Sequence, residues 1–346
     1  MKIIEMRSDT FSLPTIDMLK TIQIAELGDD VYQEDPTVIK LENKVAKILG
    51  KEAAILMPSG TMANLASILA HCPRGSKVIV SDESDIFIYE AAGAAVCGGI
   101  MYDPISTELD GSISLNSLEK SFPLDAEDPQ FALPALICLE NPHNRMGGKI
   151  LPLTYLREIK EFANGKGVPI HMDGARLFNA TVALGVDPVE ITKFADSIQV
   201  CLSKGIAAPI GSLVAGDKAF IQKVYKLRKM LGGGMRQAGI IAAPGIFALN
   251  TMTERLKIDN ENAIYLASQL IKIKGIEVAE RDVEINMVFF QISHPEHTWI
   301  TFIQHAKSKG LNLAELGHGR IRAVTHHGIT REDINQAVEI IKEILC

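Results

Sequence analysis

The first two hundred residues alternate between short apolar runs and longer amphipathic segments, and this pattern limits the fold more than any other feature. The apolar runs, in chain order, are AAILM, SKVIVSD, ALICLEN, VPIHMDG and SIQVCL. Short runs bounded by turn residues are typical of buried strands. Strands that alternate with helices predict an α/β fold with a mostly parallel sheet. Such sheets bind ligands at the carboxyl ends of their strands.

The intervening segments carry helix signals. The segment DPTVIKLENKVAKILG begins with Asp35 as the N-cap and Pro36 in the first turn, and Gly50 ends it. Further helices are predicted over PSGTMANLASILA, over LTYLREIKEFANGKG, from Ile86 to Val96, and in the stretch that leads to Ala195. Between them, these helices can cover both faces of the predicted sheet.

The pattern changes near residue 250. Beyond that point the sequence predicts a strand in VEINMVFFQI, a helix in TWITFIQHAKSKG and a strand in GRIRAVTH. A final helix has Thr330 as its cap and Asp333 three residues later, the spacing of a capping box. With 346 residues, about two domains are expected. We predict an N-terminal arm (1–15), a large domain (16–250) and a smaller C-terminal α+β domain (251–346).

Composition excludes several classes of protein. A hydrophobic content of 47 % and a charged content of 22 % are ordinary for a globular chain. The net charge of -7 argues against a nucleic-acid partner. We expect no signal peptide in MKIIEMRSDTF and no membrane span. The cysteines are scattered and odd in number, which favours a reducing cytoplasm over disulfides or a zinc site. They are Cys72, Cys97, Cys138, Cys201 and Cys346.

Two residues at predicted strand ends indicate the chemistry. Lys204 follows the apolar alternation of SIQVCL, and Asp173 ends the run VPIHMD. A lysine amine can form a Schiff base with pyridoxal phosphate (PLP), and a carboxylate can keep the pyridinium nitrogen protonated. Because the strand before Lys204 is apolar, we expect its amine to be partly desolvated and its pKa lowered. The alternatives are a surface lysine and an Asp that caps a turn before Gly174.

Two further segments can bind anions. Ser59, Gly60 and Thr61 lie between a strand and a helix start, where backbone amides and hydroxyls can hold a phosphate, although a pure capping role is equally open. The segment LRKMLGGGMRQAG combines Lys229 and Arg236 with three glycines that allow close backbone approach to an anion. A flexible basic loop is the alternative for this segment.

Taken together, RSDT, GDDVYQEDP, PSGTMAN, HMDGARLFNA, CLSKGIAAPIGS and RKMLGGGMRQAG resemble the low-specificity L-threonine aldolases. These are PLP enzymes of fold type I, the aspartate-aminotransferase-like fold, and the resemblance implies a mostly parallel sheet of the seven-stranded type in the large domain. The motifs occur in order from about residue 1 to about residue 250, and the resemblance continues more weakly through NMVF and IRAVTH. It implies a lyase that cleaves a β-hydroxy-L-amino acid to glycine and an aldehyde.

The resemblance also implies roles for individual residues. Lys204 would carry the cofactor, Asp173 would pair with its pyridine nitrogen, and Gly60 and Thr61 would bind its phosphate. Arg176 is expected near the cofactor and, with Ser8 and Arg322, at the α-carboxylate of the substrate. Three more residues are implied at the subunit boundary of a homodimer or homotetramer with shared sites: Tyr32 close to the site, with Lys229 and Arg236 reaching the neighbour's phosphate.

The sequence departs from the family pattern at two positions. Members usually carry a histidine that stacks on the cofactor, but SDIFIYEAAG places Asp85 there, followed by Glu90. A second family histidine, near the substrate hydroxyl, aligns with Gln130. Asp85 cannot stack like an imidazole, and Gln130 cannot act as a base near neutral pH. Asp85 and Glu90 are therefore our candidates for catalytic carboxyls, and Asp85 and Gln130 are also candidates for binding the substrate.

Several interpretations follow from these departures. Threonine can remain the substrate, with water, a tyrosine or Asp85 taking over the proton transfer. Alternatively, an anionic Asp85 favours a substrate with a cationic side chain. Other PLP reactions (β-elimination, transamination, transaldol transfer) and a non-catalytic PLP- or amino-acid-binding relative also remain open. A nicotinamide-dependent oxidoreductase is disfavoured because no GxGxxG follows the first strand.

Overall fold

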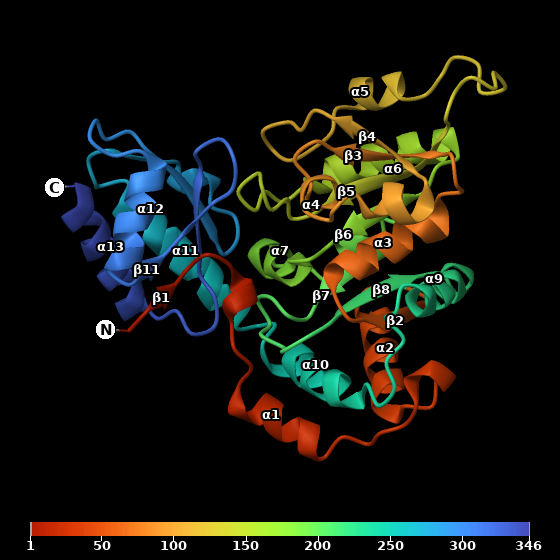
Figure 1. The fold of residues 1–346 in the computed structure, drawn as a ribbon, viewed down its shortest axis with the longest axis horizontal. Helices are drawn as coiled ribbons and strands as arrows, with labels where there is room; N and C mark the ends of the chain where they lie inside the picture. Colours follow the sequence, from red (N-terminus) through yellow and green to blue (C-terminus); the bar gives the residue numbers. More distant parts are fainter. Residues whose placement is uncertain (1, 346) are drawn as a thin grey trace.

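A seven-stranded sheet forms the centre of the molecule in this computed structural model, which describes residues 2–345; Met1 and Cys346 lie outside the described residues. The strand order is β2-β8-β7-β6-β5-β3-β4 (Figure 1). Only the pairings of β8, with β2 and with β7, are antiparallel. The predicted mostly parallel sheet is therefore confirmed. The strands are β2 (Ala53–Met57), β3 (Lys77–Ser81), β4 (Met101–Ile105), β5 (Pro134–Glu140), β6 (Ile170–Asp173), β7 (Ser197–Cys201) and β8 (Ser212–Gly216).

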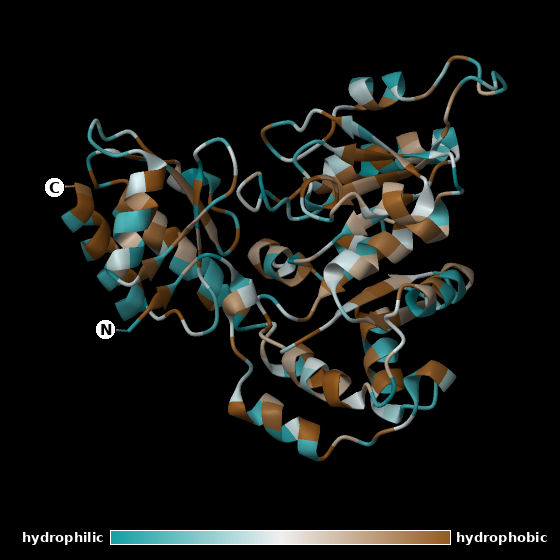
Figure 2. Ribbon diagram, in the orientation of Figure 1, coloured by the Kyte–Doolittle hydropathy of each residue, from teal (hydrophilic) through white to brown (hydrophobic). Residues whose placement is uncertain are grey.

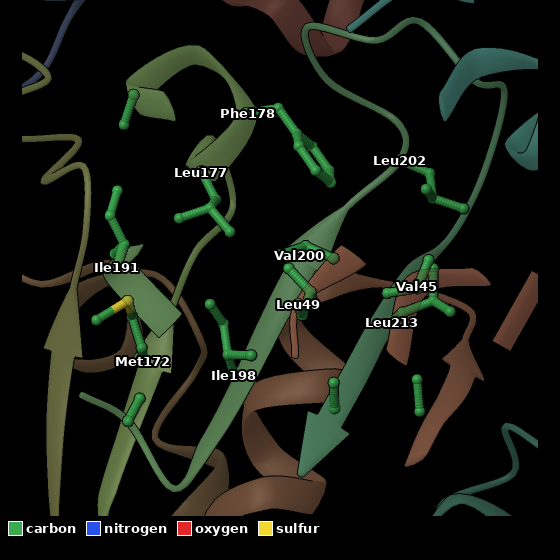
Figure 3. Close-up of a cluster of buried hydrophobic side chains, with 14 of the residues drawn as sticks. Val45, Leu49, Met172, Leu177, Phe178, Ile191, Ile198, Val200, Leu202 and Leu213 are labelled. Atoms are coloured by element: carbon green, nitrogen blue, oxygen red, sulfur yellow. The ribbon is translucent and has the colours of Figure 1, made fainter. Parts of the chain in front are cut away.

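Helices cover both faces of this sheet, as parallel strands require. One face packs against α2 (Pro36–Ile48), α6 (Leu153–Lys166), α7 (Leu177–Leu184) and α10 (Gly239–Thr251). Figure 3 shows Val45 of α2 and Leu49, just after this helix, close to Val200 and Leu213 in this layer. The other face packs against α3 (Gly60–His71) and α9 (Lys218–Met230). The central strands are mostly hydrophobic, and polar residues gather on the outer sides of helices such as α9 (Figure 2).

The C-terminal part forms a second layer with its own core. Four antiparallel strands have the order β12-β13-β10-β9. They are β9 (Ile276–Val278), β10 (Met287–Ile292), β12 (Ala314–Glu315) and β13 (Ile321–Val324), and they pack with α11 (Leu256–Leu270), α12 (Trp299–Ser308) and α13 (Arg331–Leu345). At the N-terminus, β1 (Ile4–Glu5) pairs with β11 (Leu311–Asn312) beside these helices (Figure 1). The domain boundaries drawn from the sequence stay a prediction.

Shorter elements connect these layers. They are η1 (Asp9–Phe11), α1 (Ile16–Gln23), η2 (Asp30–Tyr32), α4 (Asp85–Ile88), η3 (Ala94–Gly98), α5 (Leu115–Lys120), α8 (Val189–Thr192) and η4 (Glu280–Asp282). No helix within residues 2–345 is both long enough and apolar enough to span a lipid bilayer.

Capping signals in the sequence predicted two helix starts correctly. The Asp35 side chain accepts hydrogen bonds from the amides of Thr37 and Val38, as its N-cap assignment predicts. Thr330 and Asp333 each accept from the other's backbone amide, which completes the predicted capping box.

The predicted helix from Ile86 to Val96 is wrong. Helix α4 ends at Ile88, and Ala91 and Ala92 adopt positive φ angles of 52° and 55° before the π-helical η3 begins. This left-handed break is costly for alanine, so tertiary contacts must maintain it. Here the segment packs against α3, where a Cβ on Gly93 would lie 3.3 Å from Leu65. The stretch before Ala195 also divides, into α7 and α8. The sequence analysis missed β4, an edge strand with a proline, and the antiparallel β8.

Candidate active site

The register of β6 and β7 places the candidate site on the face covered by α3. Ile170 and Met172 of β6 point into the opposite core, so Asp173 points toward α3. In β7, Ile198 and Val200 likewise leave Gln199 on the α3 side, and Gln199 lies directly beside Asp173 in the strand pairing. The polar residues of two buried strands therefore meet at the carboxyl end of the sheet.

Three donors fix the buried Asp173 carboxylate. Asn64 Nδ2 donates to Oδ2 at 2.8 Å, and the Ala175 amide donates to Oδ1 at 3.0 Å. Gln199 Nε2 also donates to Oδ1. The Asn64 amide is oriented in turn by His171, whose Nε2 lies 3.1 Å from Asn64 Oδ1. Burial lowers the pKa of His171 to about 3, so this histidine is neutral and can donate to Asn64.

Lys204 lies at the predicted place, just beyond β7, and lines the same cavity as Asp173. Its pKa, however, is raised, and the expectation of a lowered pKa is wrong. Burial does lower the pKa of Lys204, but Cys201, Asp173 and Asp85 raise it more than burial and Arg176 lower it. Cys201 belongs to the apolar strand itself, whereas Asp173 and Asp85 come from other parts of the chain and could not be inferred from that strand.

Ser59, Gly60 and Thr61 open α3 at the rim of this cavity. The Ser59 hydroxyl accepts from the Met62 amide at 3.2 Å, so Ser59 serves as the helix cap. The first amides of the helix, at Gly60 and Thr61, carry the positive end of the helix dipole. A Cβ at position 60 would lie 3.0 Å from Cys201 Sγ, so glycine lets the helix start close against β7.

The cavity between these groups has a volume of about 330 Å³. Its lining brings together seven predicted residues from distant parts of the chain: Ser59, Gly60, Thr61, Asp85, Glu90, Asp173 and Lys204. A primary amine, a buried carboxylate held by fixed donors and a helix N-terminus are the groups that PLP requires for its aldehyde, pyridine nitrogen and phosphate. The described residues therefore fit PLP, with Lys204, Asp173, Gly60 and Thr61 as the groups that would hold it.

Asp85 occupies one wall of the cavity at the start of α4. Both of its carboxylate oxygens accept from Asn144 Nδ2, at 3.0 and 3.1 Å. The backbone amides of Asp85 and Asn144 each donate at 2.7 Å to the buried Glu140 carboxyl. Burial, reinforced by Asp85 and Asp173, raises the pKa of Glu140 well above its ordinary value. The Asp85 carboxylate is therefore hydrogen-bonded by a neutral side-chain amide.

Glu90, the other candidate acid or base, lies next to Asp173. Asn64 Nδ2 donates to Glu90 at 2.8 Å while it also contacts Asp173. Burial, with Asp173 and Asp85 nearby, raises the pKa of Glu90 well above its ordinary value. Such a shift brings a carboxyl closer to the pH at which general acid–base catalysis operates.

The three predicted carboxylate-binding residues gather around Asp9. Arg176 donates to both Asp9 oxygens at 2.7 Å, and Ser8 Oγ lies 3.4 Å from Oδ1. Burial raises the pKa of Asp9, but Arg176, with Lys204 and Arg322, outweighs burial and holds that pKa well below its usual range. Arg322 lies beyond Arg176, and burial followed by the charge of Arg176 lowers the pKa of Arg322 to about 10.

Seven predicted site residues do not line the cavity of their own chain: Ser8, Arg176 and Arg322, which lie around Asp9, and four residues that lie elsewhere. Gln130 lies in an exposed loop, where it donates to Asp128. Tyr32 is 71 % exposed on η2, and Arg236 pairs with Asp29 at 2.9 Å just before η2. Lys229 is exposed near the end of α9. Their proposed roles stay predictions, and those of Lys229 and Arg236 require a neighbouring chain.

The glycine run has a packing role that the sequence did not indicate. A Cβ on Gly233 would lie 2.2 Å from Met62 Sδ. The close approach at this position is therefore to a side chain of α3, and the predicted approach of the glycine run to an anion stays a prediction.

Sequence reasoning missed several polar residues of the site. They are Asp9, Asn64, Glu140, Asn144 and Gln199, all buried. One signal was available: a polar residue inside an apolar strand, such as Gln199 in SIQVCL, has to find a partner when buried. The partners themselves come from distant segments and could not be assigned.

Comparisons with known proteins show the family of this chain. Residues 5–293 match the family described as "Beta-eliminating lyase". The low-specificity L-threonine aldolase 1 of Arabidopsis thaliana is 40 % identical, with 100 % of this chain and 97 % of that protein covered. The low specificity L-threonine aldolase of Escherichia coli (strain K12) is 41 % identical over 96 % of each chain.

Solved structures share the fold. A threonine aldolase of Leishmania major superposes with a TM-score of 0.82 at 18 % identity, covering 98 % of this chain and 99 % of that chain. A putative aromatic amino acid β-eliminating lyase/threonine aldolase from Exiguobacterium gives 0.79 at 22 % identity, with 95 % and 94 % covered. The predicted type I fold, cofactor and enzyme class are confirmed. The chain belongs to the β-eliminating lyase family, alongside the low-specificity L-threonine aldolases, and is a PLP-dependent lyase.

Proposed function

We propose that this enzyme cleaves a β-hydroxy-L-amino acid to glycine and an aldehyde by retro-aldol cleavage, and that it prefers a substrate with a cationic side chain. The reaction type rests on the threonine aldolase relatives and on the Lys204–Asp173 pair. The substrate preference rests on one observation: the carboxylate of Asp85 lines the cavity, and its side chain is hydrogen-bonded by the neutral amide of Asn144.

The chain's own residues suit this chemistry. PLP, when bound, supplies an electron sink for the bond that breaks. Asp173, fixed by Asn64, Gln199 and a backbone amide, would keep a proton on the pyridine nitrogen. Glu90, whose raised pKa favours a protonated carboxyl, can hold or transfer a proton beside it.

Three residues can receive the remaining groups of the substrate. Arg322 and Arg176 would bind the α-carboxylate and so set which Cα bond is aligned for cleavage. An ionised Asp85 can serve as the base for the β-hydroxyl or as the partner of a guanidinium or ammonium on the side chain. In the second role it adds attraction for cations and repels an anionic side chain.

The active assembly belongs to the same proposal. Lys204 is the only lysine or arginine of the described residues that lines the cavity. Lys229 and Arg236, exposed near Tyr32, would supply cationic side chains to the phosphate of a neighbouring chain. The enzyme would then work as a homodimer or homotetramer with shared sites, and cytoplasmic localisation stays a prediction.

The test compares L-threonine with a β-hydroxy amino acid that carries a guanidinium group, scoring glycine and aldehyde release. A charge-assisted hydrogen bond in a partly buried site is worth about 1.5–3 kcal/mol, so we expect kcat/KM to favour the cationic substrate by about ten- to hundredfold. Asp85→His should abolish this preference. Glu108→Gln, which removes an exposed carboxylate outside the cavity, serves as the control.

The outcomes separate the alternatives. A wild-type enzyme that favours threonine, with no change on Asp85→His, would contradict the cationic preference but not the aldolase reaction. Release of a keto acid without glycine would contradict the aldolase reaction itself and indicate elimination or transamination.

A further inference from the structure

The two arginines near the site are held close together although their charges repel each other. Each has a different outer partner. Arg176 uses Nε and Nη2 for Asp9, at 2.7 Å each, and Arg322 uses Nε and Nη2 for the Arg7 carbonyl, at 3.2 and 2.8 Å. In both side chains these contacts leave Nη1 as the free end of the guanidinium.

The two free ends converge on one atom, Asn144 Oδ1. Arg322 Nη1 donates to it at 2.7 Å, and Arg176 Nη1 lies 3.4 Å from it. All three side chains are buried, with 4 to 7 % of each residue exposed. In this environment an amide oxygen that accepts from both cations fixes their relative orientation.

The orientation of Asn144 is itself fixed. Its Nδ2 donates to Asp85, which leaves Oδ1 to face the arginines. Its backbone amide donates to Glu140 at 2.7 Å, and the same carboxyl accepts from the amide of Asp85. One buried residue of β5 therefore anchors both Asp85 and Asn144, and Asn144 connects that pair to the arginines.

We propose that Asn144 is a positioning residue. It aligns the guanidiniums of Arg176 and Arg322 to bind the α-carboxylate of the amino acid, and it connects these two arginines to Asp85. The inference rests on the proposed function, because it assigns the arginines to substrate binding. Without Asn144, the two guanidiniums lose their shared acceptor and separate. Affinity for the α-carboxylate should then fall, whereas affinity for the amino group alone should not.

The experiment measures binding to the PLP-loaded enzyme by calorimetry, with glycine and methylamine as probes that differ by one carboxylate. Wild type should bind glycine more tightly. Asn144→Ala should reduce the ratio of the two affinities about ten- to hundredfold, the size of one hydrogen bond to a charged group. In the kinetics of any cleaved substrate, KM should rise by more than kcat falls.

Asn260→Ala is the matched control. Asn260 is exposed to the same 6 % as Asn144, and its amide bonds the Asn179 carbonyl between α11 and α7, outside the cavity lining. This variant should keep the wild-type preference for glycine. Asn144→Ser, which is small and polar but too short to bridge Asp85 and the arginines, repeats the test if the alanine variant does not fold.

Three results would overturn the proposal. These are an unchanged glycine preference in a folded Asn144 variant, the same loss in Asn260→Ala, and failure of both Asn144 variants to fold while Asn260→Ala folds. A wild-type enzyme that binds glycine but cleaves no β-hydroxy amino acid would refute the proposed function separately, because the positioning test is scored by binding.

Discussion

Asp9 should be a major contributor to stability, because it compensates the charge of a fully enclosed arginine. The side chains of Asp9 and Arg176 are 0 % and 3 % exposed, and two hydrogen bonds of 2.7 Å join them. Asp9→Asn keeps the shape but removes the charge, and its amide NH2 would face a guanidinium N–H. Breaking a buried pair from one side costs about 3–5 kcal/mol, because the remaining charge stays buried.

Equilibrium unfolding in denaturant, at fixed protein concentration, measures this cost. Asp17→Asn is the control, because its pair with Lys20 is 66 % exposed on both sides and should cost less than about 1 kcal/mol. The double variant Asp9→Asn/Arg176→Gln should be more stable than the sum of the single changes predicts, by about 2 kcal/mol. This recovery is expected because the double change leaves no unpaired charge.

The pH dependence has a definite sign. Burial raises the pKa of Asp9, but Arg176, with Lys204 and Arg322, more than offsets this and holds the pKa well below the ordinary range. A carboxyl with a depressed folded pKa stabilises the protein above its unfolded pKa, and this contribution is lost as the pH falls through the folded value. The difference in unfolding free energy between wild type and Asp9→Asn should thus be constant near neutral pH and should decrease below about pH 4. If Asp9→Asn at pH 7 loses no more unfolding free energy than Asp17→Asn does, the reasoning is refuted.

Two further predictions concern single positions. Burial raises the pKa of Glu42 to about 7, so its protonated form stabilises the fold at low pH and this contribution is lost as the pH rises through 7. Glu42→Gln can still accept a hydrogen bond from the Leu56 amide. Its unfolding free energy should equal that of wild type below about pH 5 and exceed it above pH 8 by at most about 3 kcal/mol. A difference in unfolding free energy that does not change with pH would contradict this prediction. A Cβ at Gly174 would lie 2.8 Å from the Gln199 carbonyl oxygen, so Gly174→Ala should cost about 1–3 kcal/mol in unfolding free energy. Gly165 in helix α6 has open space around it, so Gly165→Ala should be neutral or stabilising. If Gly174→Ala and Gly165→Ala change the unfolding free energy equally, the contact with the Gln199 carbonyl is relieved and the prediction is wrong.

Part of this protein was determined by local sequence. The apolar runs before Asp173 and Lys204 predicted two neighbouring strand ends, because a parallel sheet collects such ends at one edge. The helix caps at Asp35 and Thr330 could be predicted from the sequence because a capping side chain accepts hydrogen bonds from amides only two or three residues away. From these local signals and the motif order, the fold, the cofactor and the enzyme class followed.

Only the tertiary structure decided how the site is charged and held. The pKa of Lys204 is raised because Cys201 of the adjoining strand, together with Asp173 and Asp85 from other segments, outweighs its burial. Asn144 contacts Arg176 and Arg322, which are 32 and 178 residues away in the chain. The break at Ala91 is maintained against the preference of the residue itself. Electrostatic fields and long-range hydrogen bonds depend on distances in space, and a linear sequence does not contain those distances until the chain has folded.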